Sequence, residues 1–277
     1  KWVDAASSEH GDLLDVIRES LGLVQFAEIA EEARRFLSLP QETPVEPGHR
    51  LRHPSGLTAS TGAAQRLWRM ARPVAGSLAE TYLRGRGIAD LQNADPLRFL
   101  PDCYWRPEGR GPTETWPALI AAVTDLEGRV TGAHRTWLAR DGRQKAPLEP
   151  PRKAMGTLLG HGVRFGRAQD ILAAGEGIET ILSLRQILPG LPMVAALSAG
   201  HLSALLFPAQ LRRLYIVRDN DPAGNSARDS LVDRAHEVGI ETITLSPMMG
   251  DFNEDLTTHG LGAVRAEIRV QIAPEDV

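Results

Sequence analysis

The sequence predicts an α/β protein in which a mostly parallel sheet flanked by helices follows a mixed α+β region and a short helical segment. From residue 170 on, strand-like and helix-like patterns alternate. The strand-like runs cover 171–174, 193–197, 214–217 and 242–245, and the helical patterns cover 178–188, 201–206, 223–238 and 261–272. The strand-like runs are apolar without interruption, as expected for strands buried on both faces of a parallel sheet.

The stretch from 97 to 165 has the pattern of β structure. Residues 117–124 and 129–138 are two β-prone runs, and the Asp-Leu-Glu-Gly segment between them ends in the glycine that a hairpin turn favours. Short helices are expected near 63–71 and 77–85.

The first part of the chain predicts helices over 11–21 and 26–38, with Asp12 as the N-cap of the first. A segment rich in Pro, Gly, Ser and Thr follows and indicates a linker. We therefore expect four parts: a helical segment, a linker, a basic α+β subdomain and an α/β domain, over 1–45, 46–62, 63–165 and 166–277.

Composition is that of a soluble globular protein, with 42% hydrophobic and 24% charged residues among 277. No apolar run is long enough to span a membrane, and no secretory signal is visible, so a cytoplasmic location is expected by default. Cys103 is the single cysteine, which excludes an internal disulfide and a multi-cysteine zinc site. Because the sequence begins at Lys1 rather than Met, we expect a fragment of a longer chain.

Charge is distributed unevenly along the chain. Residues 46–165 carry 18 Lys and Arg against 11 Asp and Glu, whereas residues 166–277 carry 9 against 15. A basic middle beside an acidic end suits a protein that holds a polyanion near carboxylates loaded with cations. Ordinary scatter of surface charge gives the same pattern.

Three acidic segments follow strand-like runs in the α/β part. Glu176 follows the first run, Asp219 and Asp221 follow the third, and Asp251 comes after the last. Carboxylates gathered at the ends of strands repel one another unless a cation neutralises them, and oxygen ligands are those that Mg²⁺ prefers. The sequence therefore predicts a shared metal site. Glu176 and Asp221 could instead cap helices, but that role leaves Asp219 unexplained.

The order of these motifs, Glu-Gly, then Asp-x-Asp-x-x-Gly, then a late Asp, resembles the toprim domain of bacterial-type primases, topoisomerases and small nucleases. Upstream, residues 81–88, Thr-Tyr-Leu-Arg-Gly-Arg-Gly-Ile, are similar to the Tyr-Leu-x-x-Arg-Gly-Ile segment that opens the primase polymerase core. Residues 129–135 and 145–151 resemble a later segment of that core, and residues 11–17 resemble the helix that closes a primase zinc-binding module. The resemblance is strongest to toprim primases of plasmids, phages and integrated elements, that is, of mobile genetic elements.

This resemblance implies a DNA primase, which is a DNA-directed RNA polymerase and makes short RNA primers on single-stranded DNA with Mg²⁺ or Mn²⁺. Glu176, Asp219, Asp221 and Asp251 would hold the metal, and Glu176 would act as ligand or general base beside the catalytic Asp219 and Asp221. Five basic residues would bind nucleotide phosphates and template: Arg84, Arg135, Lys145, Arg152 and Lys153. The expected partners are single-stranded DNA, nucleoside triphosphates and a replicative helicase. An exposed hairpin face explains any one of the basic residues equally well.

Some features depart from the family pattern. Gly250 stands where the family has a basic residue, the zinc cysteines are absent, and no phosphate-binding loop of a helicase motor occurs. Two other functions use the same residues: a metal-dependent nuclease, and a catalytically silent module that binds single strands or docks a helicase. A topoisomerase is disfavoured because the chain has no room for gate domains.

Overall fold

The computed structural model describes residues 2–3, 10–11, 59–92, 94–107 and 111–276. The chain divides into two units, 1–55 and 56–277. In the first unit, strands β1 (Trp2–Val3) and β2 (His10–Gly11) pair antiparallel. Apart from Gly11, the predicted helices over 11–21 and 26–38 lie outside the described residues, as does most of the predicted linker over 46–62.

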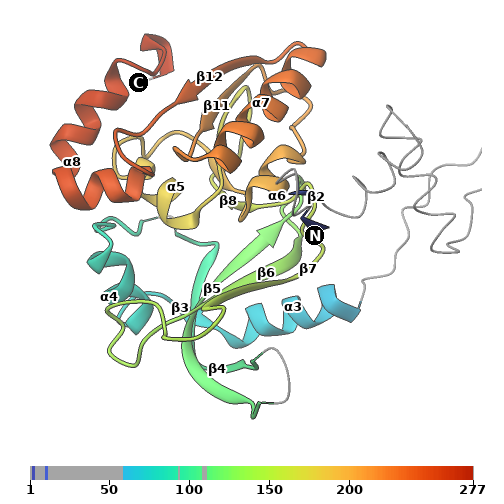
Figure 1. Ribbon diagram of the computed structural model, residues 1–277, viewed down its shortest axis with the longest axis vertical. Helices are drawn as coiled ribbons and strands as arrows, with labels where there is room; N and C mark the ends of the chain where they lie inside the picture. Colours follow the sequence, from blue (N-terminus) through green and yellow to red (C-terminus); the bar gives the residue numbers. More distant parts are fainter. Residues whose placement is uncertain (1, 4–9, 12–58, 93, 108–110, 277) are drawn as a thin grey trace, which may run out of the picture. The chain divides into compact units, whose positions relative to one another are not determined.

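The second unit begins with an antiparallel five-stranded sheet in the order β3-β4-β5-β6-β7 (Figure 1). Its strands are β3 (Arg72–Pro73), β4 (Leu97–Trp105), β5 (Glu114–Thr124), β6 (Val130–Trp137) and β7 (Arg152–Gly156). Helix α3 (Ala59–Met70) begins inside the segment predicted as linker, and α4 (Leu78–Gly85) matches the helix expected near 77–85. The predicted hairpin is confirmed, because β5 and β6 pair antiparallel.

Strand β5 lies at the centre of this sheet and is buried on both faces. Ala118 and Ile120 belong to a hydrophobic cluster with Ala64 of α3. Leu119 and Ala121 point to the opposite face, because successive side chains of a strand alternate, and join the main core of the chain.

The C-terminal sheet has the order β12-β11-β9-β10-β8. Its strands are β8 (Val163–Phe165), β9 (Ile171–Gly175), β10 (Met193–Ala195), β11 (Arg213–Val217) and β12 (Glu241–Leu245). Strands β9 to β12 are parallel and β8 is antiparallel to β10, so the prediction of a mostly parallel sheet is confirmed. Strand β8 lies within the stretch expected to be β structure, but it was not predicted as a strand of this sheet, since three residues carry too little pattern.

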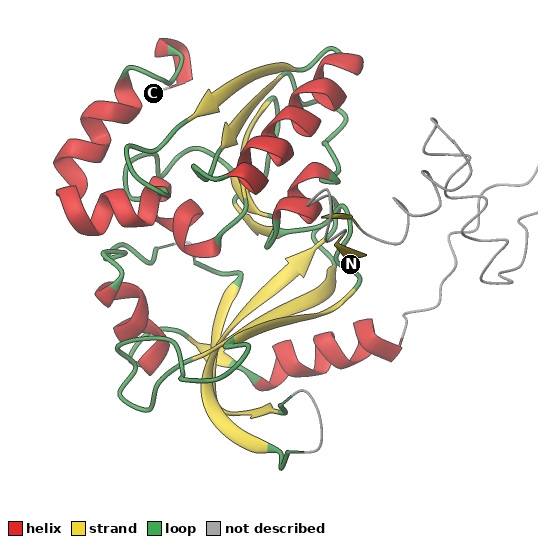
Figure 2. Ribbon diagram, in the orientation of Figure 1, coloured by secondary structure: helices red, strands yellow, loops and turns green. Residues whose placement is uncertain are grey.

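Helices cover both faces of this sheet (Figure 2). On one face α5 (Ile178–Arg185) and α8 (Phe252–Arg269) pack on the strands, and on the other face lie α6 (Ala199–Ser203) and α7 (Pro222–Glu237). The cluster beneath α5 and α8 also contains Tyr82, Phe99 and Leu119 of the N-terminal sheet region. The two sheets of the second unit therefore share one continuous core.

Helix α8 starts at Phe252 rather than at the predicted residue 261. Asp251 is its N-cap, and Gly260 interrupts the helical backbone with a φ of 77°. Glycine adopts this left-handed conformation at little cost, and its presence hides the helical pattern of the preceding turns. A final 3₁₀ turn, η1, spans Pro274–Asp276. None of the helices in the described ranges is both long and apolar enough to cross a membrane.

Candidate active site

Two acidic residues lie beyond the carboxyl ends of neighbouring strands in the C-terminal sheet. Strands β9 and β11 are parallel neighbours with Gly175 opposite Val217, so Glu176 and Asp219 emerge side by side beyond their carboxyl ends. Open α/β sheets bind ligands in the crevice beyond the carboxyl ends of their strands. The order of the strands in space therefore brings together two residues that are far apart in the sequence.

Backbone strain occurs beside Glu176. Leu197, just after β10, has a φ of 79°, and its N–H donates to the carbonyl oxygen of Glu176 at 2.8 Å. A bulky residue in the left-handed region costs on the order of 1–3 kcal/mol, and such strain is concentrated at functional sites. The hydrogen bond holds the turn that carries Glu176.

The other two acids are helix N-caps. Asp221 Oδ1 accepts the N–H of Gly224 at 2.6 Å, and Asp251 Oδ1 accepts the N–H groups of Asn253 and Glu254, both at 2.7 Å. The capping role considered for Asp221 is thus present, and it extends to Asp251. Gly224 is required here because a Cβ on it would lie 2.3 Å from the carbonyl oxygen of Asp219.

Asn220 joins the loops that carry these caps. Its backbone N–H donates to the carbonyl oxygen of Gly250 at 2.8 Å, and its side-chain amide donates to the carbonyl oxygen of Met249 at 3.1 Å. The loop before α7 is therefore fastened to the loop before α8. This contact brings Asp251 to the edge of the sheet at which Asp219 emerges.

We call Glu176, Asp219, Asp221 and Asp251 the acidic cluster. Burial, followed by the charges of Glu176, Asp251 and Asp221, raises the pKa of Asp219 to about 7. Burial and the charge of Asp221 also raise the pKa of Glu176. The positive charge of Arg152 lowers the pKa of both Glu176 and Asp219. All four predicted metal ligands therefore share one electrostatic environment.

A divalent cation fits this environment. Asp219 Oδ1 is buried and has no hydrogen-bond partner, and a buried carboxylate oxygen without a partner is unfavourable unless a cation or donor meets it. Among the described residues, however, no three His, Cys, Asp or Glu side chains are close enough to hold an ion by themselves. The carboxylates of Asp221 and Asp251 accept hydrogen bonds from the first backbone N–H groups of α7 and α8. Mg²⁺ usually keeps several waters, which can bridge to such side chains.

The family models match two segments of the chain. Residues 58–165 match a domain of unknown function (DUF7146), and residues 171–262 match the toprim domain. The C-terminal subdomain is a toprim domain. The acidic cluster lies within the matched segment, at the ends of its strands. Comparison with curated protein sequences gives no match.

Comparison with solved structures shows a primase-type fold. The crystal structure of the Aquifex aeolicus primase (zinc binding and RNA polymerase domains) matches with a TM-score of 0.54 and 18% identity, over 95% of this chain and 71% of that one. The RNA polymerase domain of the Mycobacterium tuberculosis primase DnaG matches with a TM-score of 0.48 and 16% identity, over 76% of this chain and 82% of that one.

The N-terminal sheet places predicted basic residues on its two opposite faces. Arg152 lies opposite Thr136, and Lys153 lies opposite Arg135, so these two pairs point to opposite faces. Arg152 faces the toprim domain, where its charge lowers the pKa of Asp219 and Glu176. The Arg135 guanidinium lies 5.0 Å from the Trp137 ring centroid on the other face, with its Nε buried and unpartnered.

Lys145 pairs with an acid that the sequence did not single out. Its Nζ lies 3.2 Å from Oε1 of Glu179, and the Tyr82 hydroxyl donates to the same oxygen at 2.6 Å. Burial would raise the pKa of Glu179, but Lys145 and Tyr82 outweigh it and hold this pKa near 2. In the sequence, Glu179 cannot be distinguished from an ordinary acid in the first turn of a helix.

The remaining basic residue of the prediction, Arg84, is exposed and pairs with Glu80 at 2.8 Å on α4. Its neighbour Arg86 was missed, although it is the residue that fits the Arg-Gly-Ile of the primase motif. Arg86 Nε is buried without a partner, and its carbonyl oxygen accepts the side-chain amide of Asn253 at 2.8 Å. A strict alignment of the motif would have selected Arg86 rather than Arg84.

Proposed function

We propose that this chain is a DNA primase that makes short RNA primers on single-stranded DNA, in a reaction that depends on Mg²⁺ or Mn²⁺. One observation carries the proposal: Asp219 has a buried, unpartnered carboxylate oxygen within the field of three further carboxylates. A toprim domain within a primase-type fold supports it. Single-stranded DNA and nucleoside triphosphates are the proposed partners.

Nucleotidyl transfer needs positioning and neutralisation of charge more than covalent help from the protein. The attacking ribose hydroxyl forms a bond to the α-phosphorus of the incoming nucleotide, and the bond to the bridging oxygen breaks, so that pyrophosphate leaves with the electron pair. Divalent ions held by Asp219 and its neighbours supply charge neutralisation at the phosphates.

The other residues act around this centre. Glu176, whose pKa is raised by burial and by Asp221, accepts the proton of the attacking hydroxyl. Arg152, on the face of the sheet turned toward the acidic cluster, pairs with the phosphates of the incoming nucleotide. A guanidinium suits this task because it presents two parallel donors to a phosphate.

The test is primer synthesis on single-stranded DNA with ribonucleotides and Mg²⁺. Asp219→Asn keeps the size of the side chain and removes its charge, so we expect synthesis to fall roughly 100-fold or more. The matched control is Asp229→Asn, an exposed aspartate on α7 that pairs only with Arg228 in the described structure, and it should retain activity. Full activity of Asp219→Asn would refute the proposal.

The same preparation separates the primase from a nuclease and from a silent binding module. Labelled single strand incubated with Mg²⁺ and without nucleotides should stay intact if the acids serve synthesis, whereas a nuclease shortens it. Binding that survives loss of Asp219 and Asp221, with no synthesis by the unaltered chain at any metal concentration, would favour the silent module.

A further inference from the structure

A cavity lies away from the acidic cluster. Its volume is about 780 Å³, and it is lined by the turn between β5 and β6, by β8, by the loop that leads into β9 and by the segment before β11. Polar side chains on its wall come from both subdomains: Asp95, Thr124, Asp125 and Glu127 from the N-terminal one, and Arg164, Arg167 and Gln210 from the C-terminal one. No residue of the acidic cluster lines it.

Arg164 lies on the wall of this cavity and has an unused pair of donors beneath the surface. Val163 and Phe165, its neighbours on β8, point into the core, so the Arg164 side chain points to the other face. Its Nε and Nη2 atoms are both buried and have no hydrogen-bond partner. These two nitrogens share one edge of the guanidinium, the edge that matches two oxygens of a single oxyanion.

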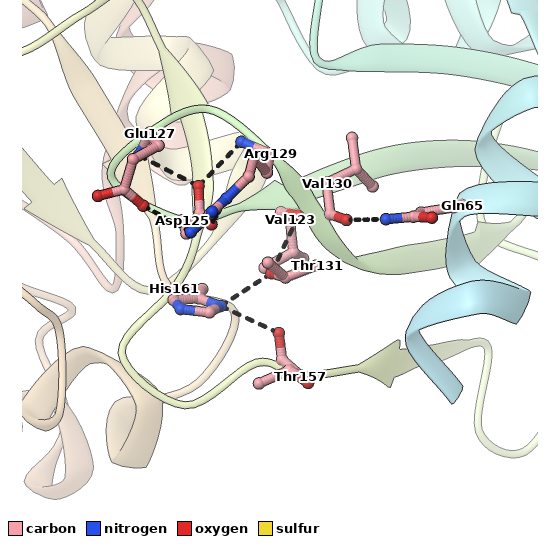
Figure 3. Close-up of polar contacts among 9 residues, drawn as sticks. All are labelled: Gln65, Val123, Asp125, Glu127, Arg129, Val130, Thr131, Thr157 and His161. Carbon is pink, nitrogen blue, oxygen red and sulfur yellow. Dashed lines mark hydrogen bonds and ion pairs between the residues drawn. The ribbon is translucent and has the colours of Figure 1, made fainter. Parts of the chain in front are cut away.

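The nearest acid does not satisfy Arg164. Asp125 is the carboxylate whose charge acts on this guanidinium, but its oxygens are already bonded within the β5–β6 turn (Figure 3). Oδ2 accepts Arg129 Nε at 2.7 Å, and Oδ1 accepts the backbone N–H groups of Arg129 and Glu127 at 2.8 and 3.1 Å. Arg129 Nη2 also pairs with Glu127 at 2.9 Å. Asp125 and Glu127 thus share the single positive charge of Arg129. The Nε and Nη2 atoms of Arg164 accordingly have no hydrogen-bonded counter-ion, although the charge of Asp125 acts on the guanidinium.

Burying a guanidinium without hydrogen-bond partners for its donors is unfavourable. Loss of the proton cannot relieve this, since arginine stays charged in proteins. We propose that the Nε–Nη2 edge of Arg164 binds the phosphate group of a small, nucleotide-sized ligand. The volume of the cavity is within the range of small-molecule sites. Arg167, exposed at the rim, supplies a second positive charge, as a phosphate monoester with nearly two negative charges requires. Asp95, also exposed, can accept a hydroxyl or amino group of the same ligand.

This site is independent of the proposed polymerisation and needs no metal. The test is thermal unfolding of the full chain in EDTA, with inorganic phosphate or adenosine monophosphate as the probe. At about 100 times the Kd, we expect Tm to rise on the order of 5 °C. A rise with both probes assigns the site to free phosphate, and a rise with the nucleotide alone assigns it to a nucleotide.

Two substitutions of Arg164 make the test specific. Arg164→Met removes a buried charge whose Nε and Nη2 donors have no hydrogen-bond partner. Without ligand its Tm should therefore be unchanged or higher, but the shift caused by the probe should vanish. Arg164→Lys keeps the charge without the paired donors and should weaken binding at least about 10-fold. Arg228→Met, which replaces a partly exposed arginine on α7, is the control, and its Tm should shift as that of the unaltered chain does.

Three results would overturn the site: no shift with millimolar amounts of either probe, an equal shift in Arg164→Met, or a lower Tm of unliganded Arg164→Met. The last would show that Arg164 stabilises the fold through Asp125 instead. Asp219→Asn should keep the shift in EDTA, so failure of this site and failure of the proposed polymerase activity are distinguishable.

Discussion

Glu179 is expected to stabilise the junction between the N-terminal sheet and the toprim domain. It belongs to α5, whereas its partners Lys145 and Tyr82 belong to the N-terminal subdomain, and its side chain is only 13% exposed. Glu179→Gln keeps the shape and removes the charge, which leaves Lys145 without its counter-ion. We expect this change to lower the free energy of unfolding near neutral pH.

The magnitude follows from the pKa. Folding lowers the pKa of Glu179 from 4.5 to about 2, and one pKa unit corresponds to about 1.4 kcal/mol, so the ionised carboxylate contributes about 3 kcal/mol. Because the folded pKa is depressed, this contribution is complete above about pH 4.5 and is lost as the pH falls through about 2. The difference between the unaltered chain and Glu179→Gln should therefore shrink by about 1 kcal/mol between pH 7 and pH 3.5.

The assay is urea unfolding of both proteins at several pH values, followed by circular dichroism. Glu127→Gln is the control, because Glu127 and its partner Arg129 are exposed and such pairs contribute well under 1 kcal/mol. Tyr82→Phe, which removes one donor to the same oxygen, should cost about 1–2 kcal/mol. If Glu179→Gln is as stable as the unaltered chain at pH 7, or if the difference does not change with pH, the reasoning is wrong.

Three further predictions concern the site. Arg152→Gln should reduce primer synthesis about 10-fold more than Lys153→Gln, because the two residues point to opposite faces of the sheet; equal losses in steady-state assays would contradict this. Since the pKa of Asp219 is raised from 3.8 to about 7, the folded protein holds a proton there that the unfolded chain releases. The Tm of Asp219→Asn, relative to the unaltered chain in EDTA, should therefore rise between about pH 4 and pH 7 and then level off. Gly224→Ala should destabilise by about 1–3 kcal/mol, since the added Cβ meets the Asp219 backbone. The control is Gly262→Ala on α8, where an added Cβ has open space around it, and this change should stabilise the protein by about 1 kcal/mol.

Much of the fold could be predicted from local pattern. The runs that became β9 and β11 are continuous and apolar because helices cover both faces of the sheet, and that composition is visible in the sequence. The hairpin of β5 and β6 was visible for a similar reason, since its turn carries a glycine at residue 128 with a φ of 81°. Strand β8 and the true start of α8 were missed, because three residues and a glycine-interrupted helix give too weak a periodic signal.

The sequence by itself determined that acidic residues gather at one end of the C-terminal sheet, because acids placed after buried parallel strands emerge at the carboxyl ends of those strands. Only the tertiary structure decided which basic residues face those acids. Strand alternation and register turn Arg152 toward the acidic cluster and Lys153 away from it, although the two are adjacent in the chain. It also decided that Lys145 is paired with Glu179, and that Arg164 is buried with two donors unused. Such pairings depend on contacts between residues far apart in sequence, which no local pattern records.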